Sequence, residues 1–525
     1  MMVPSITRPG LLATPPGKPR PFQQAQAHKT PQRKVRIAIG VVIALLLLSA
    51  FLWQWEAALL KRFLEAPRYL QRQKYADRRI VSPPDLWDDP INEEGWVPCL
   101  ERDPGYRKPV HMGKYASFYL DGGLGQQAWE LCYGVVLARL LNVTMILPSL
   151  TVDPYWKDPT PFEAIFNISH FVETLRDDIL TVNVTELPPE LQDAETTWYR
   201  DFWGVWKGAP EVYLRDALPL FQNNTVVQFV SMWQSLDDDT LSAEQLKLAC
   251  RAKFEALRFS DPILDLGNNL LKRMRQRARG PFLAVHLRFE EDMLAHSGCV
   301  YWGGVEEQER WAEMRRKREW PVPTKSDFEL RDHGKCPPSP EEIGTWLQGL
   351  GFDSSTRIYM AAGKLYDEKR AMAPFYAMFP HVFTKDMLVT SKEAAYMRGK
   401  SNIRAAVDMH VLVNADVTAL TFEGMMGEIV QGHRKWLGHK KTMKAPAFGF
   451  NKFGGSDMGS LSLGNNTWEF FSHEMRGWTY MEAGDGAPMR RQDRSWSEAL
   501  FANPLPDCMC SKARNNRTAT DSTNQ

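Results

Sequence analysis

The chain has 525 residues, 44% of them hydrophobic and 24% charged, so it is expected to form at least two globular units; a small disulfide module and a fully disordered protein are excluded. Seven basic residues and no acidic one precede Ile37, and without those seven the totals of 64 basic and 63 acidic residues become 57 and 63. The remaining body lacks the cationic excess that neutralises a nucleic-acid backbone, so no nucleic acid is expected as a partner.

The sequence predicts one membrane anchor, residues 37–55. Ile37–Trp53 is a run of 17 uncharged residues, long enough for a thin bilayer. A cleaved signal peptide and a buried core helix are the alternatives. The 36-residue leader and the lack of a clear cleavage site before Glu56 disfavour the first, and the Pro- and Gln-rich sequence and the cations ahead of the run disfavour the second. The cations predict a disordered cytosolic tail over residues 1–36 and place the body on the far side of the membrane.

Two features fit a lumenal body. N-x-S/T sequons, which are acceptors for N-glycans, begin at Asn142, Asn167, Asn183, Asn223, Asn465 and Asn516. Seven cysteines fit disulfides in an oxidising compartment, and their odd number leaves at least one without an intrachain partner; they are Cys99, Cys132, Cys250, Cys299, Cys336, Cys508 and Cys510. No C-x-x-C pair occurs, so a zinc site is not expected.

Residues 56–95 are expected to form a stem, 96–510 the globular body and 511–525 a disordered tail. In the body, short apolar runs alternate with helical patterns, which favours parallel sheets crossed by helices. The expected strands are Ala116–Leu120, Val143–Leu147, Thr225–Trp233, Phe282–Phe289, Arg357–Ala362 and His410–Val413. Helices are expected from about Gln126 to Leu141, from Pro340 behind a capping box at Ser339, and near Glu368–Met378. The economical architecture is an α/β fold of two Rossmann-like lobes, residues 96–280 and 281–510, with a ligand at the carboxyl ends of the strands.

Seven segments occur in the order seen in the plant-type O-fucosyltransferase family: DGGLGQQ (121–127), CRAKFEALRF (250–259), AVHLRFEEDMLAHSGC (284–299), GKCPPSPEEIG (334–344), STRIYMAAGKLY (355–366), GHRKWLGHKKT (432–442) and NPLPDCMC (503–510). The chain resembles this family, which is related to protein O-fucosyltransferases and includes pectin rhamnosyltransferases. The resemblance implies a single-pass type II Golgi membrane protein with a lumenal GT-B fold. It also implies transfer of a sugar from a nucleotide donor to a glycan or protein hydroxyl, with inversion and without a metal cofactor. GDP-fucose is the expected donor and UDP-rhamnose the alternative.

The chain departs from the family in one loop. Asn is usual where Asp121 and Gly125 stand, and Arg is common where Ala128 stands. A catalytically weak, membrane-tethered glycan-binding protein is therefore the alternative from another class of function.

Arg288 is the leading candidate for catalysis. Departure of a nucleoside diphosphate builds negative charge that needs fixed donors or a divalent cation, and Arg288 ends an apolar strand with a planar fork suited to phosphate. A structural ion pair with Glu290, Glu291 or Asp292 is the alternative. His286 alternates with Arg288 on one strand face; read alone it is a core residue, whereas the family pattern HxRxxxD, matched by His286, Arg288 and Asp292, implies a nucleotide contact. Asp292 either holds Arg288 or contacts the substrate, and no general base is assigned.

Further nucleotide contacts are expected at two helix starts. Gly122 and Gly123 allow close approach of a ligand to a helix N-terminus, although a plain turn also favours glycine. After a strand leading to Asp416, Thr421 sits ahead of a helix that begins near Gly424; phosphate binding by Thr421 and guanine binding by Asp416 are expected, with ordinary capping as the alternative.

Three other groups have simpler interpretations. Asp237-Asp238-Asp239 is the only string comparable to a metal-binding Asp-x-Asp and is read as a solvated loop or helix start, with no metal expected. His433, Arg434 and Lys435 are read as a basic last helical turn. Cys299 and Cys336 flank a charged insertion and are expected to pair, with two free thiols as the alternative.

Overall fold

The computed structural model describes residues 86–88, 95–120, 122–148, 150, 158–192, 197–200, 209–230, 236, 238–438, 440–445, 472 and 500–511. The predicted anchor, both predicted disordered tails apart from Ser511, and most of the predicted stem lie outside these residues. No helix of the described part combines the length and the apolar character that a membrane span requires. Pro84–Gln525 forms one compact unit, and all the elements below belong to it.

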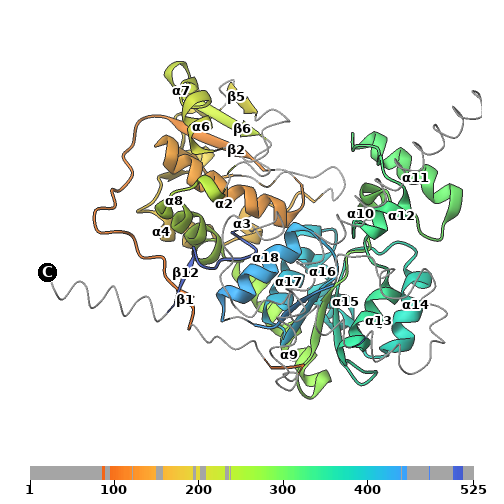
Figure 1. Ribbon diagram of the computed structural model, residues 1–525. Coiled ribbons are helices and arrows are strands. Elements are labelled where there is room, and N and C mark those ends of the chain that lie inside the picture. Colours follow the sequence, from red (N-terminus) through yellow and green to blue (C-terminus); the bar gives the residue numbers. More distant parts are fainter. Residues whose placement is uncertain are drawn as a thin grey trace, which may run out of the picture. The chain divides into compact units, whose positions relative to one another are not determined.

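The first sheet has five parallel strands in the order β4-β3-β2-β6-β5. Strands β2, β6 and β5 of this sheet are labelled in Figure 1. Their bounds are β2 Tyr115–Tyr119, β3 Thr144–Ile146, β4 Thr181–Val182, β5 Thr197–Arg200 and β6 Val226–Val230. The predicted βαβ unit is confirmed, because β2 and β3 are parallel neighbours joined by helix α2, Leu124–Leu141. The predicted strand around Val226 is confirmed as β6.

The second sheet also has five parallel strands, in the order β11-β10-β7-β8-β9. Their bounds are β7 Leu283–His286, β8 Ile358–Ala361, β9 Val382–Thr384, β10 Val417–Leu420 and β11 Thr442–Lys444. In chain order, β7, β8 and β9 follow one another toward one edge of the sheet, whereas β10 and β11 follow one another from β7 toward the opposite edge. The strand order therefore reverses between β7 and β10, which is where ligands bind in open α/β sheets.

One predicted strand is wrong. His410–Val413 belongs to helix α17, Ser401–Asn414, and the strand is β10 four residues further on. Val411 and Leu412 are fully buried, and a short apolar run of this kind does not distinguish a buried helix from a strand. The predicted strands at β7 and β8 are confirmed, as are the predicted helices α13, Pro340–Leu350, and α14, Glu368–Met378. Ser339 accepts from the Glu342 amide as the capping box requires.

The remaining helices complete the two halves of the unit. Near the first sheet are α3 Phe162–Ile165, α4 Ile168–Leu175, α5 Pro189–Gln192, α6 Pro210–Asp216, α7 Leu220–Asn223, α8 Ala243–Cys250, the short turns η1 Val184–Glu186 and η2 Asp238–Thr240, and the π-helical turn η3 Arg251–Ala256. The others are α9 Asp261–Ala278, α10 Glu291–Ser297, α11 Gly304–Lys317, α12 Asp327–Asp332, α13 Pro340–Leu350, α14 Glu368–Met378, α15 Lys385–Leu388, α16 Ser391–Met397 and α18 Met425–Trp436. Although α9 precedes residue 280, it packs on α17 beside the second sheet.

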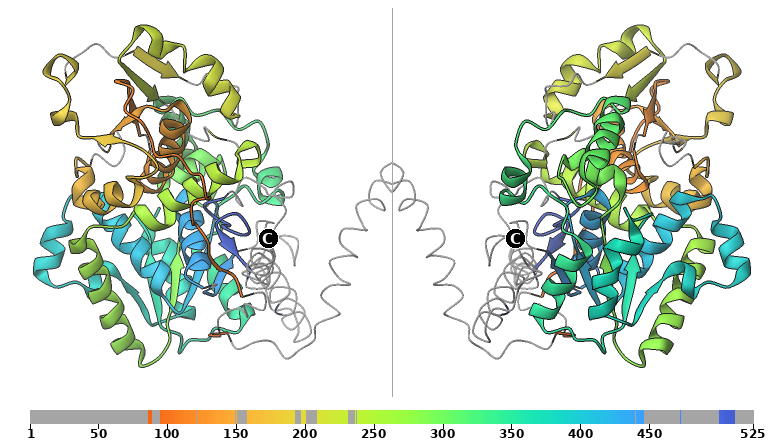
Figure 2. Two further views of the ribbon diagram at one scale, coloured as in Figure 1. Left: turned by 90° about the vertical axis from the view of Figure 1, so that its left-hand side faces the viewer. Right: turned by 90° about the vertical axis from the view of Figure 1, so that its right-hand side faces the viewer.

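Alternate residues of the second sheet enter two different cores, with helices on both sides (Figure 2). Leu283 and Val285 pack with α13 and α14, whereas Ala284 packs with α9, α17 and α18. His286 follows the same alternation and lies on the α17–α18 side, where its ring carbon is 3.8 Å from the position of a Cβ on Gly427. The pleat of β7 thus points His286 toward α18.

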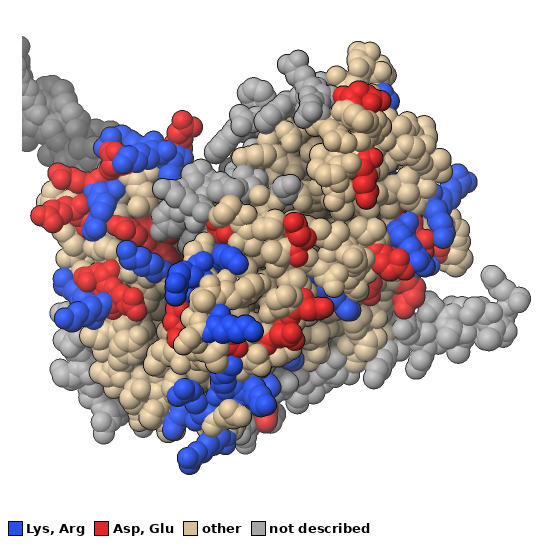
Figure 3. Space-filling model, turned by 180° about the vertical axis from the view of Figure 1, so that it is seen from behind, with Lys and Arg blue, Asp and Glu red and all other residues tan. Residues whose placement is uncertain are grey.

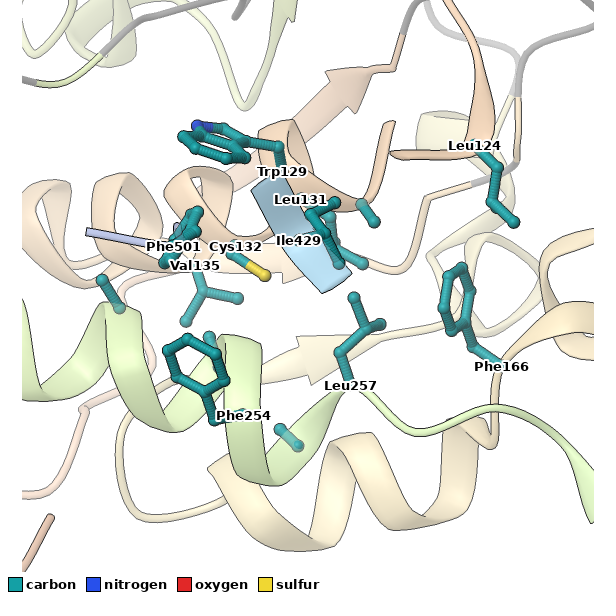
Figure 4. Close-up of a cluster of buried hydrophobic side chains, with 14 of the residues drawn as sticks. Leu124, Trp129, Leu131, Cys132, Val135, Phe166, Phe254, Leu257, Ile429 and Phe501 are labelled. Carbon is teal, nitrogen blue, oxygen red and sulfur yellow. The ribbon is translucent and has the colours of Figure 1, made fainter. Parts of the chain in front are cut away.

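Helix α2 joins the core of the first sheet to helices of the second. Its buried side chains occupy every face, as expected for a helix packed on all sides. Figure 4 shows Leu131 and Val135 of this helix facing Leu257, Phe254 and Ile429, where Ile429 belongs to α18. The two halves therefore share one hydrophobic cluster, so α2 and α18 are held side by side.

The two ends of the body meet in a small antiparallel pair, β1 Val97–Pro98 with β12 Met509–Cys510. Two disulfides secure this junction, Cys99–Cys510 and Cys250–Cys508. The predicted Cys299–Cys336 disulfide is present and closes the insertion that carries α11 and α12. Cys132 is a buried free thiol on α2. Basic and acidic side chains are interspersed over much of the face seen in Figure 3, in keeping with the near-neutral composition.

Candidate functional site

The carboxyl ends of β7 and β10 meet at the point of strand reversal. Leu420 is the partner of His286 in the sheet, and the amide of Thr421 donates to the His286 carbonyl at 3.2 Å. The Thr421 hydroxyl in turn accepts from the amide of Arg288 at 3.1 Å. Thr421 is 2% exposed, and its hydrogen bond holds the backbone of Arg288 in place. The hydroxyl proton of Thr421 is not used in this bond and remains available for donation.

The side chain of Arg288 lies against the start of helix α18. A Cβ placed on Gly424 would stand 1.5 Å from Nη1 of Arg288, and Gly424 adopts a φ of +154°. Only glycine tolerates both this backbone conformation and this contact. Gly424 is the N-cap of α18 and offers no side-chain cap, so no side chain of the N-cap residue takes up the first amides of the helix, and the guanidinium of Arg288 lies beside this helix end.

A second helix N-terminus reaches the same place. Gly122, with φ +73°, turns the chain from β2 into α2, and Gln127 donates to its carbonyl at 2.7 Å. A Cβ on Gly125 would lie 3.2 Å from the amide nitrogen of Met426, so the first turn of α2 touches the first turn of α18. Two positive helix ends and Arg288 are thereby assembled into a site suited to an anion with several charges, such as a diphosphate.

His286 is a neutral group under this site. It is 6% exposed, and burial together with the nearby Arg288 charge lowers its pKa to about 4. Its Nδ1 lies 3.4 Å from the Ala361 carbonyl, which favours a proton on Nδ1 and leaves Nε2 as an acceptor. His286 can therefore position a ligand by hydrogen bonding but does not add positive charge near pH 7.

The acidic residues that follow Arg288 have different hydrogen-bond and ion-pair partners. Glu291 pairs with Arg310 at 3.1 Å, and Glu290 accepts from the Gly363 amide at 2.9 Å. Among the described residues no carboxylate forms an ion pair with Arg288, so the alternative of a structural pair at this position finds no support. Burial raises the pKa of Glu290 and of Asp292, which makes both better proton acceptors once they are ionised.

Asp416 does not join the site. It precedes β10, at the amino end of the strand, whereas Thr421 follows the carboxyl end. Its carboxylate accepts from the Phe282 amide at 3.0 Å and lies 4.0 Å from Arg275. The error has the same cause as the misplaced strand at residues 410–413. Once β10 begins at Val417, the predicted role of Asp416 in guanine binding loses its geometric basis.

The interpretation of Asp237-Asp238-Asp239 is corrected in part. Asp238 begins the short turn η2, in keeping with a helix start. It is buried and accepts from the Tyr133 hydroxyl at 2.5 Å and the Leu500 amide at 2.9 Å, so it is a structural acceptor and not a solvated residue. Asp237 lies outside the described residues. His433, Arg434 and Lys435 lie in the last turn of α18, as predicted. Arg434 is in addition fully buried and donates to backbone carbonyls of α17 and of the chain before β10.

Sequence reasoning missed the roles of Gly424 and Gly125. A glycine three residues after Thr421, the candidate for phosphate binding, is a weak signal by itself. The close approach of α18 explains why a larger polar residue does not stand at Gly125, because its side chain would meet the backbone of Met426. Of the two other departures noted in this loop, Ala128 is buried in α2 and Asp121 lies outside the described residues.

Comparisons with known proteins show the family of this chain. Residues 117–437 match the family model O-FucT, described as GDP-fucose protein O-fucosyltransferase. The chain is 34% identical to O-fucosyltransferase 6 of Arabidopsis thaliana over 431 residues, covering 81% of this chain and 73% of that protein. It is also 34% identical to rhamnogalacturonan I rhamnosyltransferase 1 of Arabidopsis thaliana over 407 residues, covering 76% of this chain and 78% of that protein.

A crystal structure of POFUT1 in complex with GDP-fucose is similar at 14% identity and a TM-score of 0.37, covering 67% of this chain and 99% of that chain. The relatives and the matched family confirm the resemblance drawn from the motifs. On these grounds the chain belongs to the O-fucosyltransferase family of glycosyltransferases.

Proposed function

We propose that this chain transfers fucose from GDP-fucose to a hydroxyl group of a glycan or protein, with inversion and without a metal cofactor. The observation that carries the proposal is the Arg288 guanidinium, which has no ion pair among the described residues and lies at the meeting point of two helix N-termini. The matched family and the O-fucosyltransferase relatives support a fucose donor. The two parallel sheets, held together through α2 and α18, support a GT-B arrangement with the donor between them.

In the proposed step the bond between C1 of the sugar and the β-phosphate oxygen breaks while the acceptor oxygen bonds to C1 from the opposite face. The electron pair of the broken bond stays with GDP, so negative charge grows on the β-phosphate. Arg288 and the amides at the starts of α2 and α18 are fixed donors for that charge, and they do not need to reorganise during the reaction. The acceptor proton passes to a base that we leave unassigned between Asp292 and Glu290.

We also propose a lumenal Golgi location behind a single-pass type II anchor. The uncharged run Ile37–Trp53, the basic residues before it and the sequons support the anchor and its orientation. The three disulfides in the described part of the chain support an oxidising compartment.

The donor is tested by thermal shift of the purified body. GDP and GDP-fucose at about 100 times their dissociation constants are expected to raise Tm by about 3 °C, because a ligand stabilises only the folded state that binds it. UDP and UDP-rhamnose are expected to leave Tm unchanged. A rise in Tm with the uridine nucleotides alone would instead support the alternative function, a UDP-rhamnose-dependent rhamnosyltransferase. The 34% identical rhamnosyltransferase relative is the reason for testing this alternative. Glycan binding without any nucleotide response would instead indicate a glycan-binding protein.

A further inference from the structure

A buried carboxyl group without a partner lies one turn into helix α18. Glu428 is 3% exposed, and neither of its side-chain oxygens has a hydrogen-bond partner within the described residues. On the same helix face Gln431, three residues on and 6% exposed, has an unpartnered Oε1. Buried polar groups are nearly always hydrogen-bonded in folded proteins, so two such groups on adjacent turns indicate acceptors kept for something outside the chain.

The position of Glu428 directs it toward the proposed donor site. It follows Gly424 by four residues, so the two lie one above the other on α18, and side chains on a helix lean toward its N-terminus. Gly427, the adjacent residue, faces His286. The carboxyl group of Glu428 therefore reaches back along the helix toward the end that touches Arg288.

The charges around Glu428 place it at the carboxyl edge of the second sheet. The charged groups that act on it are Lys444, Glu423 and Arg288, and Lys444 ends β11 beside Leu420. Burial, only partly offset by Lys444 and Arg288, raises the pKa of Glu428 to about 7. A carboxyl group in this state is poorly solvated by the protein and gains from a ligand that donates hydrogen bonds to it.

We propose that Glu428 accepts hydrogen bonds from sugar hydroxyl groups of the bound nucleotide sugar. The inference rests on the proposed function, because it needs a diphosphate at the start of α18. A nucleotide sugar carries hydroxyl groups on both sides of its diphosphate, on the ribose and on the transferred sugar. A carboxylate suits either set and is unsuited to the phosphates themselves, which repel it. Glu428 then adds recognition of a hydroxylated ring to the recognition of charge by Arg288.

The binding test compares Glu428→Gln and Glu428→Met with wild type in calorimetric titrations of GDP, 2′-deoxy-GDP and GDP-fucose. Both variants are expected to bind GDP-fucose about 10-fold or more weakly. If the ribose is the partner, GDP loses the same factor and 2′-deoxy-GDP does not; if the transferred sugar is the partner, only GDP-fucose is weakened. Glu423→Gln is the control, because Glu423 is an exposed carboxylate near the same helix start and pairs with Lys335 at 3.6 Å. This substitution should change the affinity by less than 2-fold, about the error of such titrations.

The second measurement separates a binding role from a structural one. Glu428→Met removes a desolvated carboxyl group, so the ligand-free variant is expected to melt about 2 °C above wild type at pH 8. The folded pKa near 7 is raised above the ordinary 4.5, so the carboxyl destabilises the fold fully above pH 7 and hardly at all below pH 4.5. The gain in Tm should therefore shrink as pH falls toward 5. A lower Tm at pH 8, or unaltered affinity for every nucleotide, would overturn the role of Glu428 alone, whereas absence of nucleotide binding by wild type would overturn the proposed function with it.

Discussion

Replacing Arg288 by alanine is expected to reduce the rate of fucose transfer by about 1,000-fold, the effect of removing one fixed donor to a developing anion. Nothing else described near Gly424 can take its place, because His286 is neutral and the helix amides carry only partial charge. Arg288→Lys should recover only part of the loss, since a lysine ammonium restores the charge without the planar fork. The measurement is kcat/KM for GDP-fucose with a fixed acceptor.

Arg357→Ala is the matched control for this experiment. Arg357 is also half-buried and belongs to the same sheet, but it precedes β8 at the opposite, amino edge and donates to the Ser355 carbonyl. Its removal should leave kcat/KM within about 2-fold of wild type while testing for general loss of folded protein. Equal losses in the two variants would show that the Arg288 effect is one of folding and would remove it from the catalytic site.

Asp178→Asn is expected to destabilise the body by about 3–5 kcal/mol, the largest effect on stability that we predict. Asp178 is fully buried and forms ion pairs with Arg251 at 2.6 Å and with Arg102 at 2.5 Å. The Arg251 side chain is 4% exposed. It also accepts from the Tyr106 hydroxyl at 2.7 Å. The substitution leaves the Arg251 charge buried without an ion-pair partner. A buried, unpaired charge destabilises the folded state by more than the intact ion pair stabilises it. Urea unfolding followed by tryptophan fluorescence gives the midpoint and slope from which the difference is calculated.

Asp177→Asn is the control for this prediction. Asp177 is the preceding residue and pairs with the exposed Lys108 at 2.7 Å, so it has the same chemistry in a solvated setting. An exposed pair contributes little, and the midpoint should not move measurably. A midpoint for Asp178→Asn that coincides with that of Asp177→Asn would contradict the importance of the buried cluster.

Much of the fold follows from local patterns. The Gly-Gly turn after an apolar run predicts the β2–α2–β3 unit, and Ser339 with Pro340 marks the start of α13. Strand β7 and the position of Arg288 beyond it also follow from the run of apolar residues that ends there. These features depend on neighbours in sequence, so one sequence is enough to find them.

The parts that were missed depend on tertiary contacts. Val411 is apolar whether its segment is a buried helix or a buried strand, and only the packing of α17 on α9 decides for the helix. That single shift moved Asp416 from the expected carboxyl edge of the sheet to its amino edge. The role of Gly424 depends on the approach of Arg288, and the role of Glu428 depends on its burial without a hydrogen-bond partner. Neither property can be predicted from the neighbouring residues in the sequence.

In the proposed site Arg288 recognises the β-phosphate of a guanosine nucleotide at the adjoining starts of α2 and α18. The most direct test is the ratio of the dissociation constants of GMP and GDP, measured by calorimetry for wild type and for Arg288→Ala. We predict that wild type prefers GDP by about 100-fold, as charge-assisted bonds to one phosphate would give, and that the preference falls to a few-fold in the variant. An undiminished preference for GDP in Arg288→Ala would show that Arg288 does not recognise the β-phosphate.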